Sequence, residues 1–206
     1  MSDPVEVFAD ITCPFTHVGL KQVVRHLATL DRTIEVIVRA WPLEWVNDAP
    51  LEADAVLAKA QALSTQLNTA DFSGLNSNHW PTTTIPALNL AAAGYALSAA
   101  TGLAVSLDLR ASVFEEGRDI SDPQVLAEVA ARNGIQEFDF RPDPCEAVQR
   151  DYNAGQSLGV SGSPHFWVGD DNFFCPALDL GHDDDGNLTA RFDTAALAEF
   201  FKRIDA

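Results

Sequence analysis

The stretch from Asp10 to Gly19 constrains this chain most, because a buried strand ends and a helix begins within it. Residues 5–10 alternate and then break, which is typical of a buried strand. Pro14 suits the first turn of a helix, where its missing N–H group costs nothing. Cys13 therefore lies at a helix N-terminus, where free N–H groups and the helix dipole favour an anion. We interpret Cys13 as a reactive thiol and not only a packing cysteine, since cysteines at helix N-termini have lowered pKa values.

The rest of the chain places two β-containing segments around a long helical one. A helix over residues 14–28 and a strand over residues 34–41 complete a βαβ unit, so the first two strands are expected to be parallel. The β signal returns at residues 165–168, a turn leads to another strand from Phe173, and a helix closes the chain. The acidic residues 182–187 are expected to form a solvated loop. Between the two β-containing segments the pattern predicts helices over residues 53–67, 87–101, 103–116 and 125–132, and one more from Asp143 onward.

Charge and composition exclude several classes of function. The 206 residues include 30 acidic and 13 basic side chains, for a net charge of −17. Nucleic acids and anionic membranes attract basic surfaces, so neither is an expected partner. No leader peptide and no apolar run as long as a membrane span is evident, so we expect a cytoplasmic protein with reduced thiols. The 3 scattered cysteines are too few for a disulfide framework or a four-ligand zinc site, and we expect no metal.

Three stretches carry a resemblance to a known family. They are Cys13 to Gly19 after the apolar strand, Phe114 to Pro123 in the helical segment, and Gly159 to Phe166 before the late strands. In this order they resemble the DsbA-like branch of the thioredoxin superfamily, in particular its FrnE-like cytoplasmic members. The resemblance implies an α/β thioredoxin fold made of residues 1–42 and 160–206, with an all-helical insertion over residues 43–159.

The resemblance also implies which residues meet the substrate. Pro164 would be a cis-proline that faces the active cysteine. The backbone of Ser163 would pair with an extended, cysteine-containing substrate, as in a short β-augmentation. Pro14 and Phe15, inside the motif, would complete the substrate-binding surface. Aromatic side chains more often belong to the core than to a ligand site, and Phe15 is the one that we select.

Thr16 departs from the redox pattern of this family. Its oxidoreductases carry Cys-x-x-Cys, and Thr16 stands where the second cysteine would be. Cys13 therefore lacks the partner that resolves a mixed disulfide. Thr16 lies one helical turn after Cys13, so we expect its hydroxyl to donate to the thiolate. The first hypothesis is a monothiol reaction: Cys13 attacks a mixed disulfide, and glutathione or another low-molecular-weight thiol completes the turnover as a cosubstrate, with no tightly bound cofactor.

Two other functions stay open. Kappa-class glutathione transferases and 2-hydroxychromene-2-carboxylate isomerases are similar in architecture and carry Ser-Pro-x-x at this position. There the motif holds the thiolate of glutathione, so Cys13 or Thr16 would hydrogen-bond a bound thiol in a transferase or isomerase. The third hypothesis is a non-catalytic module that binds a partner through the same groove. A small thiol or a disulfide-containing molecule is the expected partner, and a homodimer stays open.

Three further residues are candidates near the site. His17 follows the motif and His165 follows the expected cis-proline, so either is a candidate to tune the thiolate or contact a substrate. Cys175 ends a late strand that approaches the cis-proline loop in this fold, so it is a candidate to replace the missing resolving thiol. The competing interpretation of Cys175 is a small buried side chain, because free cysteine is among the most buried residue types. A disulfide requires Cα atoms within about 7 Å, which the sequence does not establish.

Overall fold

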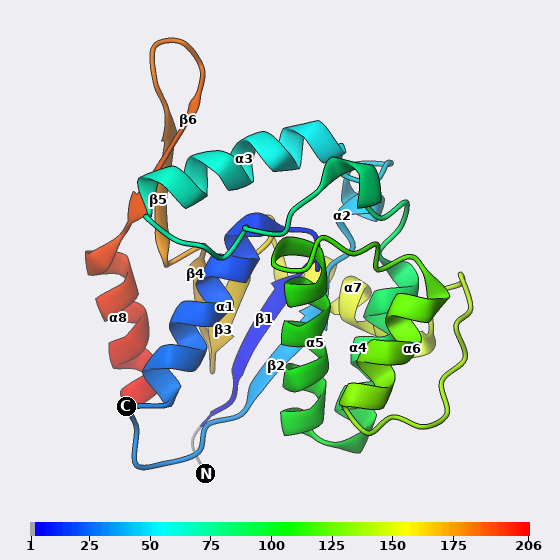
Figure 1. The fold of residues 1–206 in the computed structure, drawn as a ribbon. Helices are drawn as coiled ribbons and strands as arrows, with labels where there is room; N and C mark the ends of the chain where they lie inside the picture. The colour runs from blue at the N-terminus through cyan, green and yellow to red at the C-terminus, as the bar shows by residue number, and fades with distance from the viewer. Residues whose placement is uncertain (1–2) are drawn as a thin grey trace.

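A four-stranded sheet forms the centre of the computed structural model, which describes residues 3–206 (Figure 1). Its strands lie in the order β2 (Val36–Ala40), β1 (Val5–Ala9), β3 (His165–Val168) and β4 (Asp171–Phe174). β1 and β2 are parallel, as the βαβ pattern predicts. β3 is antiparallel to β1, and β4 is antiparallel to β3. The thioredoxin arrangement expected from the sequence is therefore confirmed.

Apolar side chains hold two helices on one face of this sheet. α1 (Pro14–Leu27) and α8 (Thr194–Asp205) pack on the alternate strand residues that point toward them. The buried members of this layer include Val5, Val7, Leu20, Val23, Phe166 and Phe200. Burying each such side chain contributes roughly 1.5–3 kcal/mol. Because β1 and α1 are both anchored in this layer, the turn between them, which carries Cys13, has a fixed place at the end of the sheet.

α7 (Glu146–Leu158) covers the opposite face of the sheet. Phe8, Trp41 and Trp167 form a buried aromatic cluster on this side, with edge-to-face contacts at Phe8. A Cβ atom on Gly155 of α7 would lie 2.6 Å from the Trp41 ring. α7 approaches the sheet this closely because position 155 is glycine.

The other helices follow β2 in the chain. They are α2 (Leu43–Val46), α3 (Ala53–Gln66), the 3-10 helix η1 (Ser77–His79), α4 (Ile85–Leu97), α5 (Ala99–Phe114) and α6 (Pro123–Arg132). The break between α4 and α5 falls earlier than predicted, because Ser98 caps α5 by accepting a hydrogen bond from Thr101 N over 3.0 Å. Within residues 3–206, no helix combines the length and the hydrophobicity that a membrane span requires. The division into residues 1–42 plus 160–206 and an insertion over 43–159 stays a prediction.

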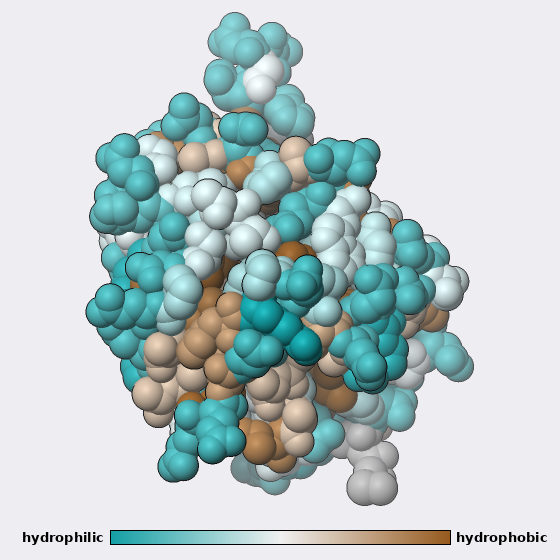
Figure 2. Space-filling model, turned by 90° about the vertical axis from the view of Figure 1, so that its right-hand side faces the viewer, coloured by the Kyte–Doolittle hydropathy of each residue, from teal (hydrophilic) through white to brown (hydrophobic). Residues whose placement is uncertain are grey.

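The structure contains a second, two-stranded sheet near the C-terminus, which the sequence did not predict. β5 (Leu178–His182) and β6 (Leu188–Phe192) form a hairpin that projects away from the body of the molecule (Figure 1). The expected loop over residues 182–187 is the tip of this hairpin, and its hydrophilic surface stands at the top of Figure 2. Asp183 closes the tip by accepting hydrogen bonds from the backbone of Asp185 and Asn187. Each strand has only 5 residues, and the acidic, glycine-containing segment between them has the composition of a solvated loop, so the sequence pattern did not indicate a hairpin.

Candidate active site

Cys13 occupies the position that the sequence predicts, at the start of α1. It is the N-cap residue with φ −79° and ψ 113°, and Pro14 follows within the first turn. The Cys13 side chain is buried, and its Sγ donates a hydrogen bond to the Ser163 carbonyl oxygen over 3.0 Å. N-terminal N–H groups of α1 and the helix dipole favour a thiolate at this place.

The loop that faces Cys13 contains a cis peptide bond between Ser163 and Pro164, as the family resemblance implies. The Ser163 hydroxyl oxygen accepts a hydrogen bond from Asp10 N over 3.0 Å and lies 2.8 Å from the Thr16 hydroxyl oxygen. Through its carbonyl and its hydroxyl, Ser163 thus contacts the end of β1, the cysteine and the first turn of α1. The cis-proline loop and the cysteine turn form one hydrogen-bonded unit.

The Thr16 hydroxyl is engaged with the cis-proline loop, and its expected donation to a Cys13 thiolate stays a prediction. Its hydroxyl pairs with the Ser163 hydroxyl, and no hydrogen bond joins it to the Cys13 sulfur in the part of the chain that the structure describes. Spacing along a helix places Thr16 one turn from Cys13, but an N-cap side chain leaves the helical path, and the fully buried Thr16 turns toward the cis-proline loop instead. Thr16 therefore positions Ser163, which in turn accepts from the thiol.

Asp10 is a site residue that the sequence interpretation missed. Its carboxylate accepts from Thr12 N over 2.7 Å and from Leu43 N over 2.9 Å, so it joins the cysteine turn to the start of α2. Its carbonyl oxygen accepts from the buried Arg110 guanidinium over 3.1 Å. The sequence did contain a signal for this role: Asp10 is an acidic residue at the end of a buried strand, and a buried carboxylate needs several hydrogen-bond partners.

His17 belongs to a different cluster from the thiol. Its buried ring packs on Phe72 and Phe114, and its Nε2 lies 3.1 Å from the Asp71 carbonyl oxygen and 3.2 Å from Glu115. Burial, followed by the charge of nearby Lys21, lowers the pKa of His17 to about 4. The ring is therefore neutral near pH 7 and anchors α1 to the helical segment, and its role toward Cys13 stays a prediction.

His165 is likewise engaged elsewhere. Its Nδ1 accepts from Ser161 N over 3.3 Å, so the proton is on Nε2, which donates to Asn172 Oδ1 over 3.1 Å. The ring packs against Trp167 at an interplanar angle of 39°, with the ring centroids 4.0 Å apart. Burial lowers the pKa of His165. These contacts hold the imidazole on β3, and its candidate role at the thiol stays a prediction.

Cys175 lies beside the cis-proline loop, at the end of β4. Its backbone N–H donates to the Pro164 carbonyl oxygen over 3.0 Å, and its φ of 46° is a left-handed conformation that only a fixed turn maintains. All 3 cysteines are free thiols. Burial, with a smaller contribution from Cys13, raises the pKa of the Cys175 thiol to about 12. The structure thus brings Cys175 into the neighbourhood of the site as a protonated thiol.

The remaining predicted residues frame the cysteine. Pro14 is buried, and Phe15 is half-buried with its ring packed against the main core. Within residues 3–206, no cluster of histidine, cysteine and carboxylate side chains is arranged to hold a metal ion.

Comparison with known proteins decides the family. A family model described as the DSBA-like thioredoxin domain matches residues 4–182. The chain belongs to this family. The resemblance seen in the sequence is confirmed at that level, and the family's members are thiol oxidoreductases or isomerases. No curated protein matches the chain by sequence.

Solved structures share the fold at low sequence identity. The cytosolic disulfide reductase DsbM from Pseudomonas aeruginosa, solved with GSH, is 17% identical with a TM-score of 0.60, and the match covers 82% of this chain and 88% of that one. A probable DsbA oxidoreductase from Streptomyces coelicolor is 19% identical with a TM-score of 0.62, covering 83% and 82%. A 2-hydroxychromene-2-carboxylate isomerase is 18% identical with a TM-score of 0.55, covering 82% and 87%. At these identities the likeness establishes the fold alone.

Proposed function

We propose that this chain is a monothiol member of the DsbA-like family that acts through Cys13. The observation that carries the proposal is the place of the Cys13 thiol, at the N-terminus of α1 and 3.0 Å from the carbonyl oxygen of the residue before the cis-proline. Thr16 occupies the position of a second motif cysteine. Cys175 has a pKa of about 12, so its thiolate is too rare near pH 7 to resolve an adduct efficiently.

The proposed reaction has two thiol–disulfide exchanges. The Cys13 thiolate attacks a sulfur of a mixed disulfide, forms a new S–S bond and expels the substrate thiol as a thiolate. A low-molecular-weight thiol, in its thiolate form, then attacks the adduct, regenerates Cys13 and leaves as a disulfide. One low-molecular-weight thiol is consumed in each turnover: the substrate leaves as a thiol, the other half of its mixed disulfide leaves joined to the incoming thiol, and protons exchange with water.

Ser163 changes its role along this path. In the resting state its carbonyl oxygen accepts a hydrogen bond from the Cys13 thiol. Once Cys13 is deprotonated, the carbonyl loses that donor and faces an anion, so the thiolate is released toward the substrate. The freed carbonyl then accepts an N–H group of an extended substrate, with Pro164 and Phe15 beside it.

Glutathione is the cosubstrate that we favour. The DsbM structure was solved with GSH, and that protein is described as a cytosolic disulfide reductase, which supports both the cosubstrate and the expected cytoplasmic location. A homodimer and the FrnE-like subgroup stay as predictions.

A glutathione-dependent transferase or isomerase is the second candidate. The small exposed fraction of Cys13, 3%, favours it, because a side chain that only hydrogen-bonds a bound thiol needs less access than one that attacks a disulfide. The fold is also shared with a 2-hydroxychromene-2-carboxylate isomerase. In this alternative the Cys13 thiol would donate its hydrogen bond to the glutathione sulfur instead of to the Ser163 carbonyl oxygen.

Intact-mass measurement separates the two functions. The wild-type chain and Cys13→Ser are incubated with oxidised glutathione at neutral pH, and binding of reduced glutathione is measured by calorimetry. The monothiol function predicts one glutathione adduct on the wild type, removed by reduced glutathione and missing in Cys13→Ser. Tight binding of reduced glutathione with no adduct would support the transferase or isomerase instead. If the wild type forms no adduct and binds no reduced glutathione, both functions are contradicted, and the non-catalytic binding module is left.

A further inference from the structure

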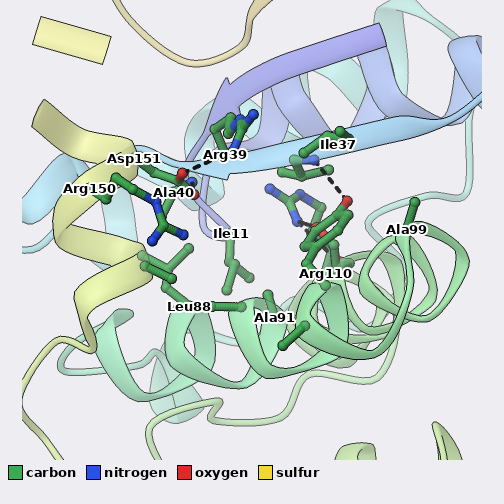
Figure 3. Close-up of a pocket in the computed structure, with 16 residues that line it drawn as sticks. Ile11, Ile37, Arg39, Ala40, Leu88, Ala91, Ala99, Arg110, Arg150 and Asp151 are labelled. Carbon is green, nitrogen blue, oxygen red and sulfur yellow. Dashed lines mark hydrogen bonds and ion pairs between the residues drawn. The ribbon is translucent and has the colours of Figure 1, made fainter. Parts of the chain in front are cut away.

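A cavity of about 320 Å³ lies at the free edge of β2, apart from Cys13 and Ser163 (Figure 3). α4, α5 and α7 surround it, and Ile11 is its one lining residue from the cysteine turn. Its walls are largely apolar and include Ile37, Leu88, Ala91, Ala92 and Ala99. The volume falls at the small end of the range of about 300–1,000 Å³ that is typical of small-molecule sites.

The exposed edge of β2 is already satisfied by protein groups. The Tyr95 hydroxyl donates to Val36 O over 3.1 Å and accepts from Val38 N over 2.7 Å. The Asp151 carboxylate accepts from Ala40 N over 3.1 Å and pairs with Arg39 over 3.3 Å. Because these side chains cover the strand edge, the cavity offers no open backbone for another strand, and its occupant must be a small molecule.

Arg110 supplies a charge at the inner end of this cavity. It is fully buried, and Figure 3 shows its side chain among the residues that line the space below β2. Its guanidinium donates to Ser106 over 2.9 Å and to Asp10 O over 3.1 Å, while Nε has no hydrogen-bond partner. Burial lowers its pKa to about 10, so the group is still charged near pH 7.

The Arg110 guanidinium makes no hydrogen bond to a carboxylate within residues 3–206, since its partners are carbonyl and hydroxyl oxygens, and the favourable charge of the buried Asp10 carboxylate acts on it without direct contact. Arg39 and Arg132, in contrast, each pair with carboxylates. The one carboxylate that lines the cavity, Asp151, is committed to Arg39 and Ala40. The Nε atom of this buried guanidinium is left without a hydrogen-bond partner, and a bound anion would supply one.

The two ends of the cavity differ in access. Ala96 and Arg150 are exposed at its outer end, whereas Ile11 and Arg110 are buried at the inner end. Figure 2 shows that the face carrying α4, α6 and α7 has a band of hydrophobic surface interrupted by strongly hydrophilic residues. An apolar molecule with one acidic end therefore finds both an entrance and a buried cation. The overall charge of −17 disfavours unspecific anion binding, so the attraction is local to this cavity.

We propose that this cavity binds a small monocarboxylate with an apolar tail. Its carboxylate contacts the Arg110 guanidinium, which presents N–H groups in the geometry that carboxylates accept. Its tail lies along the alanine-rich wall of α4 toward Ala96. The proposal concerns a site distinct from the thiol and does not depend on the reaction of Cys13.

Calorimetric titration with hexanoate tests the site in the full chain. We expect saturable binding of one hexanoate, with 1-hexanol and inorganic phosphate at least tenfold weaker because each lacks either the carboxylate or the tail. Arg110→Gln is expected to weaken hexanoate at least tenfold. The absence of saturable hexanoate binding to the wild type, or equal binding of 1-hexanol, would overturn the proposal.

A matched pair of variants keeps the test decisive if Arg110→Gln does not fold. Ala92 lines the cavity and neighbouring Ala93 does not, and both are half-buried on α4. Ala92→Leu fills the cavity and is expected to abolish hexanoate binding, while Ala93→Leu preserves it. Equal binding to both variants would place hexanoate elsewhere on the protein and overturn the site.

Discussion

The Cys13 sulfur donates a hydrogen bond to the Ser163 carbonyl oxygen across 150 residues of sequence, and the distance is 3.0 Å. This contact joins the first turn of α1 to the cis-proline loop. It also means that the thiol gives up a hydrogen bond when it ionises, while the helix N-terminus stabilises the resulting anion. The reactivity of Cys13 therefore depends on residues that hold Ser163 in place.

Thr16→Val tests the contact that holds Ser163. The substitution keeps the shape of the side chain and removes the hydroxyl that lies 2.8 Å from Ser163 Oγ. We expect a loss of about 1 kcal/mol in the free energy of unfolding, measured by urea denaturation, because a buried hydrogen bond is lost. Thr16→Ser retains a hydroxyl and serves as the control. Equal stability of Thr16→Val and Thr16→Ser would show that the hydroxyl contact contributes nothing.

Cys175→Ala tests whether a second cysteine takes part in turnover. With a pKa of about 12, the Cys175 thiol is a thiolate in roughly one molecule in 10⁵ at pH 7, too few for fast attack on an adduct. We expect the variant to form and lose the glutathione adduct on Cys13 at rates within about twofold of the wild type. Intact mass over time provides the measurement. A Cys13–Cys175 disulfide in the mildly oxidised wild type would contradict the monothiol mechanism.

Local patterns made much of the fold predictable from the sequence. The strand over residues 5–10, Pro14 and the late β segment fix the thioredoxin arrangement, and the family resemblance added the cis bond at Pro164. These features depend on neighbours in the chain or on a motif. The hairpin of β5 and β6 was missed although β6 alternates apolar and polar residues, because each strand has only 5 residues and the acidic segment between them was interpreted as a solvated loop.

The side-chain contacts of the site were not predictable in the same way. Asp10 finds partners 33, 74 and 153 residues away, so its importance is a property of the folded chain. His17 and His165 lie next to motif residues in sequence, yet both rings point into other clusters. Proximity along the chain indicates the element on which a residue lies, whereas the tertiary packing decides which way its side chain turns.

Thr16→Cys tests whether a cysteine at position 16 is sufficient to turn this site into a dithiol that forms a disulfide with Cys13. Position 16 follows Cys13 within the first turn of α1, which is the spacing of the family's redox motif. We expect a disulfide between Cys13 and the introduced cysteine after mild oxidation, detected as the loss of two free thiols in a thiol count. Thr16→Ser is again the control and keeps all of its thiols. An oxidised variant without this disulfide would show that the Ser163 contacts hold the two positions apart.

His17→Gln tests the buried imidazole through the pH dependence of stability. The folded pKa of about 4 lies below the ordinary value of 6.5, so the unfolded chain takes up a proton first as the pH falls. The contribution of His17 is fully present above pH 6.5 and is lost progressively toward pH 4. The wild type is expected to lose up to about 3 kcal/mol through this group across that window, given about 1.4 kcal/mol for each pKa unit.

Urea denaturation at several values between pH 4.5 and pH 7.5 measures this effect. In His17→Gln the amide cannot titrate, so the free energy of unfolding should fall less steeply with acid than in the wild type. His182→Gln is the control, because it makes the same substitution at a histidine that is exposed at the hairpin and far in sequence from His17. Parallel curves for His17→Gln and the wild type would show that the folded protein accepts a proton at His17 as readily as the unfolded chain, and the anchoring role assigned to the neutral ring would then be wrong.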